Sequence, residues 1–165
     1  MAAYLALSAR VAKELQELEQ VVKRCLDIWH QAEASGDDLY VDGVALNLHS
    51  FYTGLERIFD LAVTEVDQTL PTGATWHQEL LRQAATEIPR LRPAMITDKT
   101  RDRLDRYRGF RHVVRNIYAL ELDKEQIRPL VHDLQSVFAD VKSELLRFAE
   151  ALAQIDQSGG VPGQT

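Results

Sequence analysis

Apolar residues recur at spacings of three and four over very long stretches of this chain. A side chain every three or four residues lies on one side of an α-helix, so each stretch predicts a helix with one apolar face. Residues 4–34 carry Leu7, Val11, Leu15, Leu18, Val22, Cys25 and Trp29. Residues 42–67 carry Leu48, Phe51, Leu55, Ile58, Ala62 and Val66. Residues 124–156 carry Ile127, Leu130, Leu134, Val137, Val141, Leu145, Phe148 and Leu152.

Two more helices are predicted between these stretches, a short one over 76–88 and a long one over 98–120. Pro89 and Pro93 bracket the irregular link between them. The expected end signals are Gly36 after the first helix and the N-caps Thr75, Thr97 or Asp98, and Asp123. Four long helices and one short helix with short loops favour an all-α, antiparallel up-and-down bundle over an extended coiled coil. We expect one domain over 1–156 and a disordered tail over 157–165.

Composition excludes several classes of protein. A single cysteine, Cys25, permits no disulfide within the chain and no cysteine-based zinc cluster. The five histidines have no metal-ligand spacing, so we predict no metal site and no cofactor. No apolar run approaches the roughly 20 residues that cross a bilayer, and residues 1–10 do not resemble a signal peptide. We therefore expect a cytoplasmic protein without membrane association.

Charge is distributed unevenly along the chain. The net charge is −6, yet residues 99–115 carry seven Lys and Arg against two Asp, a local charge of +5. Such a basic segment on an acidic protein can bind a phosphate or an acidic partner. Alternatively, it is a solvated helix face that neighbouring carboxylates balance.

A helical wheel of residues 98–120 separates two faces. One arc, the predicted core face, carries Phe110, Val113, Val114, Ile117 and Leu120, with Arg106 close to it. The opposite arc carries Arg108, Arg111, His112, Arg115 and Asn116, with Tyr118 at its edge. Arginine binds phosphate, histidine transfers protons near neutral pH, and a phenol can accept a nucleotidyl group. Arginine and histidine are also common on ordinary polar helix faces.

The run from Tyr107 to Tyr118 resembles the signature of HepT-like proteins in the HEPN superfamily, small helical bundles that form toxin–antitoxin pairs with a minimal nucleotidyltransferase. That signature is Arg, a polar residue, three variable residues, His, one variable residue and Tyr. Arg111, His112 and Tyr118 match it, whereas Asn116 occupies the histidine position. Segments 51–58, 70–77, 92–94 and 122–123 are similar to the family too.

The resemblance implies metal-independent cleavage of RNA by a homodimer, whose two motif helices form a composite cleft. Arg111 would bind the scissile phosphate, with Arg108 and Arg115 as further substrate-binding residues. The motif histidine would be the general acid or base. The nucleotidyltransferase antitoxin would neutralise the toxin by adenylylating Tyr118.

Asn116 leaves alternatives open, because an amide can donate a hydrogen bond but cannot relay a proton. His112 can replace the motif histidine. Arg106 and His112 also satisfy the looser superfamily spacing, although the wheel points them apart. Otherwise the nuclease is weak or inactive, and the protein is an adaptor that binds the nucleotidyltransferase, or another acidic partner, through the same basic face. A structural dimer whose arginines pair with acidic residues is the plainest alternative.

A few residues outside the motif have two interpretations each. Glu56 either faces the basic segment and orients an arginine or is an ordinary surface glutamate. His49 and His77 are expected to be surface or interface histidines. Gly54 lies inside a helix, where it can permit the close approach of another helix. Cys25 lies on an apolar stripe and is expected to be inert.

Overall fold

The structure is a computed structural model that describes residues 3–116 and 121–158. Its elements are α1 (Ala3–Ser35), α2 (Leu39–Ala62), the π-helical segment η1 (Val63–Asp67), α3 (Trp76–Ala84), α4 (Asp98–Asn116) and α5 (Lys124–Ser158). Within these ranges there is no strand beyond a single bridge between Ile88 and Arg92. The predicted all-α class is therefore confirmed. None of the described helices is long and apolar enough to cross a membrane.

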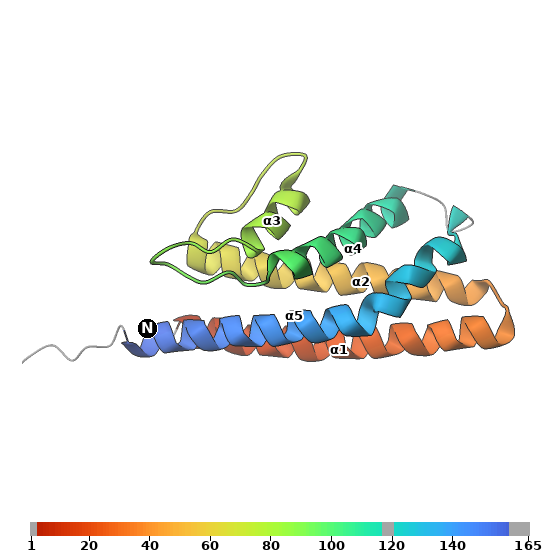
Figure 1. Cartoon of the computed structure of the whole chain (residues 1–165), viewed down its shortest axis with the longest axis horizontal. Coiled ribbons are helices and arrows are strands. Elements are labelled where there is room, and N and C mark those ends of the chain that lie inside the picture. Colours follow the sequence, from red (N-terminus) through yellow and green to blue (C-terminus); the bar gives the residue numbers. More distant parts are fainter. Residues whose placement is uncertain (1–2, 117–120, 159–165) are drawn as a thin grey trace, which may run out of the picture.

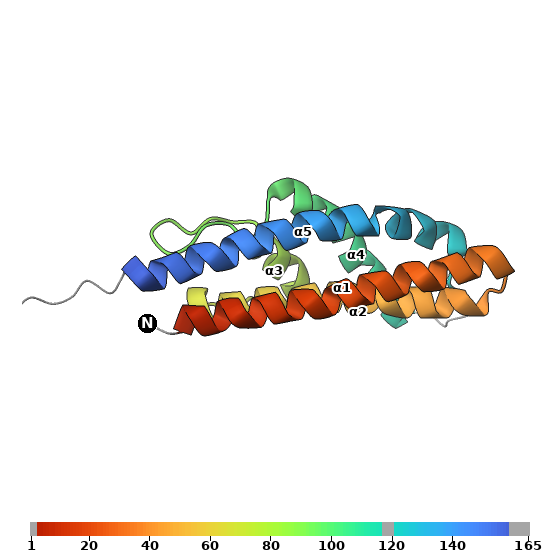
Figure 2. The same ribbon diagram turned by 90° about the horizontal axis from the view of Figure 1, so that it is seen from below.

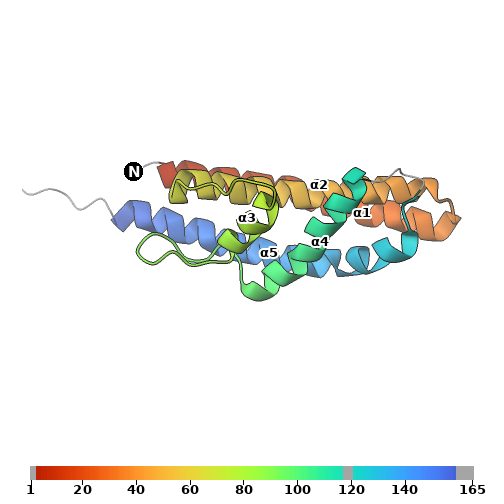
Figure 3. The ribbon, with the colours of Figure 1, turned by 90° about the horizontal axis from the view of Figure 1, so that it is seen from above.

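The long helices alternate in direction, as an up-and-down bundle requires (Figure 1). Helix α1 packs along its length against α2 and α5, which both run antiparallel to it (Figure 2). Helix α4 crosses obliquely from α5 to α2, and the short α3 lies beside it over α2 (Figure 3). The start of α1 meets the end of α5, where the backbone N–H of Tyr4 donates to Asp156 (3.0 Å).

The three predicted apolar stripes form one hydrophobic core. Every residue of each stripe is buried, from Leu7 to Trp29, from Leu48 to Val66 and from Ile127 to Leu152. Cys25 lies fully inside this core, and burial raises the pKa of its thiol to about 12. The thiol is therefore protonated and unreactive at neutral pH, as its position on the stripe predicts.

Several predicted boundaries move by a few residues. Helix α2 begins at Leu39 instead of Asp42, and its last turn widens into η1 before Gln68 ends it in a left-handed conformation (φ 56°). Helix α3 ends at Ala84 rather than at residue 88, and Ile88 instead forms a bridge with Arg92. Helix α5 continues to Ser158, so the first two residues of the predicted tail are helical. Residues 159–165 lie outside the described ranges.

The cap predictions have mixed outcomes. The hydroxyl of Thr97 accepts the backbone N–H of Thr100 (3.2 Å), so Thr97 and not Asp98 caps α4. Asp123 caps α5 by accepting the N–H of Glu125 (2.9 Å), and Gly36 ends α1 with a positive φ of 68°. Thr75 precedes α3 but makes no side-chain cap.

The predicted core face of α4 is only partly confirmed, because Phe110 and Val114 pack against the core but are not its deepest residues. The buried residues of α4 are Thr100, Leu104 and Tyr107, and the Tyr107 hydroxyl donates to the Leu130 carbonyl (2.7 Å). Phe110 and Val114 are only half-buried, and Val113 is 39% exposed. The prediction is based on the apolar residues in the C-terminal half of α4, whereas the N-terminal half of this helix is buried more deeply. The two remaining predicted core residues, Ile117 and Leu120, lie outside the described ranges.

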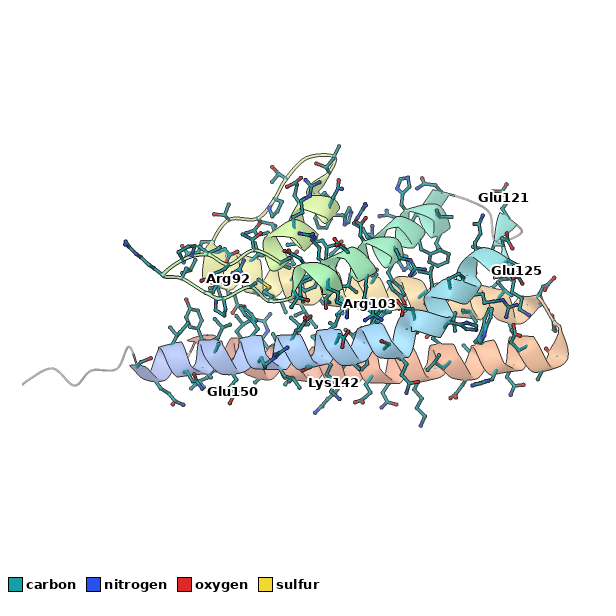
Figure 4. All side chains as sticks on the ribbon, viewed as in Figure 1. Arg92, Arg103, Glu121, Glu125, Lys142 and Glu150 are labelled. Atoms are coloured by element: carbon teal, nitrogen blue, oxygen red, sulfur yellow. The ribbon has the colours of Figure 1, made fainter. Side chains whose placement is uncertain are left out.

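A buried ion pair ties the α3–α4 link to the end of η1. Asp67 and Arg92, the latter labelled in Figure 4, have side chains that are only 2% and 0% exposed. Nη2 of Arg92 lies 2.7 Å from Oδ2 of Asp67. The same guanidinium donates to the backbone carbonyls of Gln83, Thr86 and Pro93. Because the charge of Arg92 is paired and its N–H groups donate to these carbonyls, the ion pair holds α3 and the link before α4 in place.

Arg103 joins α4 to α5 in a similar way at the surface. Its guanidinium, labelled in Figure 4 between α4 and α5, donates to Asp133 (2.8 Å) and to Asp140 (2.7 Å), both on α5. Arg106 lies 3.8 Å from Asp133 and is half exposed, rather than close to the apolar face as the wheel suggests. These arginines thus serve packing between helices.

Gly54 permits the close approach that its position in a helix suggests. A Cβ atom added there would overlap Cδ2 of Leu18 on α1. We expect Gly54→Ala to destabilise the fold by about 1–2 kcal/mol, because overpacking outweighs the better helix propensity of alanine. A Cβ atom added at Gly109 on α4 would meet no atom within 4 Å, so Gly109→Ala should stabilise by about 1 kcal/mol. Urea unfolding measures the change in the free energy of unfolding for both variants. Equal changes in the two variants would contradict the packing explanation.

Candidate functional site

Arg111 continues the buried stripe of α4 instead of facing solvent. It follows Thr100, Leu104 and Tyr107 at helical spacings of four, three and four, and its side chain is half-buried. Its Nη1 lies 3.3 Å from Nε2 of His77 on α3. Its Nε is buried without a hydrogen-bond partner among the described residues. The predicted phosphate-binding arginine is therefore directed at α2 and α3.

His77 stands between Arg111 and a buried carboxylate. Its Nδ1 lies 2.7 Å from Oε2 of Glu56 on α2, and the two side chains are 21% and 8% exposed. The ring of Trp76 stacks on the imidazole with centroids 3.6 Å apart. A guanidinium can only donate, so Nε2 of His77 accepts from Arg111 and Nδ1 carries the hydrogen donated to Glu56. The hydrogen-bond network assigns the tautomer, and Glu56 acts on the arginine through His77.

Two more side chains of α2 face this cluster. The Tyr52 hydroxyl is buried without a hydrogen-bond partner among the described residues. Burial raises the pKa of Tyr52 well above its usual range, and the nearby Glu56 raises it further. Burial lowers the pKa of His49, and the charges of Arg111 and Arg115 lower it further. Both groups are therefore neutral near pH 7 beside a cationic residue.

Carboxylates neutralise much of the basic segment. Arg101 pairs with Asp98 and Asp102, and Arg103 and Arg106 pair with residues of α5. Arg108 donates to Asp105 at 2.7 Å. Among the described residues, no ion pair with a carboxylate is formed by Lys99, Arg111 or Arg115. The alternative of a balanced helix face thus holds for four of the seven basic residues, and of the other three Arg111 and Arg115 lie within the motif.

His112 and Asn116 lie on a different side of α4 from the Arg111–His77 contact. Both are exposed, and Asn116 Nδ2 donates to the backbone carbonyl of His112 (2.7 Å). Its distance to His112 Nδ1 is 3.4 Å. Arg115 is exposed on the same last turn. Tyr118, the predicted modification site, lies outside the described residues.

The structure therefore divides the predicted site. Arg111 joins Glu56 and His77 where α2, α3 and α4 meet, whereas His112, Arg115 and Asn116 form an exposed face at the end of α4. The interpretation that Glu56 orients an arginine is close to the observed arrangement, because Glu56 contacts His77 and His77 contacts Arg111. The contribution of His77 was missed. The sequence carried no signal for this contact, because Glu56 and His77 lie on different helices and are 21 residues apart.

Comparison with known proteins agrees with the sequence motif. Residues 43–152, from α2 through most of α5, match the family model described as HepT-like protein. The chain belongs to the HepT-like family. Neither a curated protein nor a solved structure matches it significantly. Both the α4 motif and the α2 and α3 residues that contact it lie within the matched part of this HepT-like protein.

The described residues of this HepT-like protein include no group of three or more His, Cys, Asp or Glu side chains arranged to hold a metal ion. Arg111 and Arg115 can bind a phosphate, and the imidazole of His77, oriented by a carboxylate, can accept a proton.

The titration of His49 should report on this cluster. Its pKa is lowered in the folded state, so folding favours the neutral ring. The contribution of the neutral ring to the free energy of unfolding is complete above about pH 6.5, the pKa of an unperturbed histidine, and is lost as the pH falls below that value. We expect Arg111→Ala and Arg115→Ala each to raise the pKa of His49, measured by NMR. Arg101→Ala, whose charge is paired with Asp98 and Asp102, is the control. A His49 pKa that neither variant raises would show that the arginines do not face it.

Proposed function

We propose that this HepT-like protein is the toxin of a toxin–antitoxin pair and cleaves RNA without a metal ion. The observation that carries the proposal is the geometry of Arg111, whose guanidinium has a buried, unpartnered Nε and is held by His77 instead of a carboxylate. An arginine without a carboxylate partner beside a histidine is suited to a phosphodiester. Arg115 supplies the second positive charge, one helical turn away. Arg108 contributes less than its sequence position suggests, because Asp105 neutralises it.

A homodimer fits the exposed end of α4. His112, Arg115 and Asn116 face outward there, and the apolar side chain of Val113 is 39% exposed beside them. In the proposed dimer two such ends meet, cover Val113 and bring His112 and Asn116 of each protomer to one composite cleft. His112 is a candidate for the proton transfer that Asn116 cannot perform. RNA and the antitoxin would both be encountered in the cytoplasm.

Cleavage of RNA by the purified protein in the presence of EDTA tests this function. A fluorescent single-stranded RNA should be cut to products with 2′,3′-cyclic phosphate ends, and the all-deoxy version should stay intact because it lacks the attacking 2′ hydroxyl. The protein should elute as a dimer at the assay concentration. A folded, dimeric protein that leaves a panel of RNAs intact would contradict the nuclease.

We further propose that the partner is a minimal nucleotidyltransferase that transfers AMP from ATP to the Tyr118 hydroxyl and releases pyrophosphate. We expect incubation with the partner, ATP and Mg²⁺ to add the mass of one AMP to the wild-type chain. Tyr118→Phe should gain no mass and should stay toxic when both proteins are produced together. Mass spectrometry checks the first outcome and growth the second. An unmodified wild-type protein that the partner still neutralises would contradict adenylylation.

Asn116 favours a second candidate, an adaptor without nuclease activity that binds the nucleotidyltransferase through the same basic end of α4. The adaptor needs charge and shape but no proton carrier, so His112→Gln should keep partner binding, while Arg115→Glu should weaken it. Co-elution of the two proteins with no RNA cleavage by either would support the adaptor over the toxin.

A further inference from the structure

The imidazole closest to the proposed phosphate-binding arginine comes from α3 and not from the α4 motif. Nε2 of His77 lies 3.3 Å from Nη1 of Arg111, whereas His112 is exposed and contacts Asn116. A group that transfers a proton at a phosphodiester must lie within hydrogen-bond reach of the reacting oxygens. His77 meets that requirement for a phosphate held by Arg111, because its Nε2 already lies within hydrogen-bond distance of the Arg111 guanidinium.

His77 is also oriented as a proton-transfer group requires. Glu56 holds Nδ1 at 2.7 Å, which leaves the lone pair of Nε2 as the basic atom, and the stacked ring of Trp76 limits rotation of the imidazole. When Nε2 takes a proton, the buried carboxylate stabilises the imidazolium. His112 has no carboxylate partner among the described residues.

Other titratable groups around His77 are poorly suited to the task. From α2, Tyr52 keeps its proton because its pKa is raised, and His49 is a weakened base because its pKa is lowered. From α4, Arg108 is engaged by Asp105, and Arg111 is the phosphate ligand. His77 is therefore the one group among these whose basic atom is directed at the proposed phosphate site.

We propose that the Glu56–His77 pair is the general base of the RNA cleavage, in place of the histidine that Asn116 replaces in the motif. This proposal rests on the proposed nuclease function. When the Arg111 guanidinium turns to the scissile phosphate, it releases Nε2 of His77, which accepts the proton of the 2′ hydroxyl. The 2′ oxygen then forms its bond to phosphorus as the bond from phosphorus to the 5′ oxygen breaks. The 5′ oxygen takes a proton from water, and the resulting hydroxide takes the proton from His77, which restores the neutral ring.

The test measures cleavage by full-length wild type, His77→Gln, Glu56→Gln and His112→Gln in EDTA, over a range of pH. Each glutamine keeps polar side-chain atoms, and circular dichroism and thermal unfolding check the fold. We expect His77→Gln to lose about 100-fold or more in rate and to lose the acid limb of the pH–rate profile. Its affinity for an uncleavable 2′-deoxy oligonucleotide should stay within about threefold, because Arg111 is unchanged. Glu56→Gln should lower the rate and move the acid limb to lower pH.

The outcomes separate this proposal from the proposed function. If wild type cleaves RNA while His77→Gln keeps the wild-type rate and pH profile, the assignment of His77 as general base is wrong, and the proposed nuclease function is unaffected. Loss of activity in His112→Gln alone would then assign the proton transfer to His112. If wild type does not cleave, the nuclease and its base are both overturned.

A second measurement applies if His77→Gln fails to fold. In the wild-type protein, the 2′-deoxy oligonucleotide should shift the Nε2 resonance of His77 in a ¹⁵N NMR spectrum, because Arg111 leaves that atom for the phosphate. Addition of the same oligonucleotide to Arg111→Ala should give no such shift. An Nε2 resonance unchanged by the bound oligonucleotide in wild type would overturn the proposal.

Discussion

Replacing Arg111 with alanine should reduce RNA cleavage by about 100-fold to 1000-fold, the usual loss when one donor to a developing oxyanion is removed. Among the described residues, the guanidinium of Arg111 forms no ion pair with a carboxylate, and its Nε has no hydrogen-bond partner. Growth inhibition by the protein should disappear with cleavage. The fold should survive, because among the described residues the substitution breaks one hydrogen bond, that with His77.

Arg101→Ala is the matched control for this prediction. Arg101 lies on the same helix and carries the same charge, but Asp98 and Asp102 already hold its guanidinium. It should keep cleavage within about twofold, since surface ion pairs of this kind contribute little. Arg111→Ala with undiminished growth inhibition would overturn the assigned role. Equal losses in both variants would point to general attraction of RNA by positive charge.

Replacing Asp67 with alanine should destabilise the fold by about 3–5 kcal/mol, because it leaves the Arg92 guanidinium buried and without its counter-charge. Arg92 is fully buried, and its remaining contacts are the backbone carbonyls of Gln83, Thr86 and Pro93. Urea unfolding measures the change in free energy. For a small domain with a stability of about 5–15 kcal/mol, such a loss is a large part of the total.

Glu19→Ala provides the comparison for that loss. Glu19 pairs with Lys142 at 3.1 Å between α1 and α5, but both side chains are well exposed, so the change should stay below about 1 kcal/mol. If Asp67→Ala also lowered the free energy of unfolding by less than about 1 kcal/mol, water would have to reach Arg92. Since the pair anchors α3, any folded Asp67→Ala protein should also show a displaced His77 and slower cleavage.

The sequence alone determined the class and most of the architecture. The stripes of α1, α2 and α5 repeat over about five to seven turns, and residues so regularly spaced can only be buried together on one side of a helix. The family also followed from sequence, because its motif depends on local order along α4. The predicted all-α bundle and the family are both confirmed.

Periodicity was insufficient for α4, which is polar along most of its length and has few apolar residues to mark a core face. Its orientation comes from its oblique packing against α2 and α5, through Thr100, Leu104 and Tyr107. A rotation of the helix by about one residue separates the predicted face from the observed one. That rotation turns Arg111 inward and leaves Val113 exposed.

The contact of Arg111 with His77 and Glu56 was decided only by the tertiary structure. The three residues lie on three helices and are separated by 21 and 34 positions along the chain, so no local pattern connects them. The distance between them depends on the angle of α4 and on the buried Asp67–Arg92 pair beneath α3. The sequence thus determined which helices form and which family they belong to, because both depend on local spacing. The packing of those helices decided which histidine meets the arginine, because that depends on distances across the core.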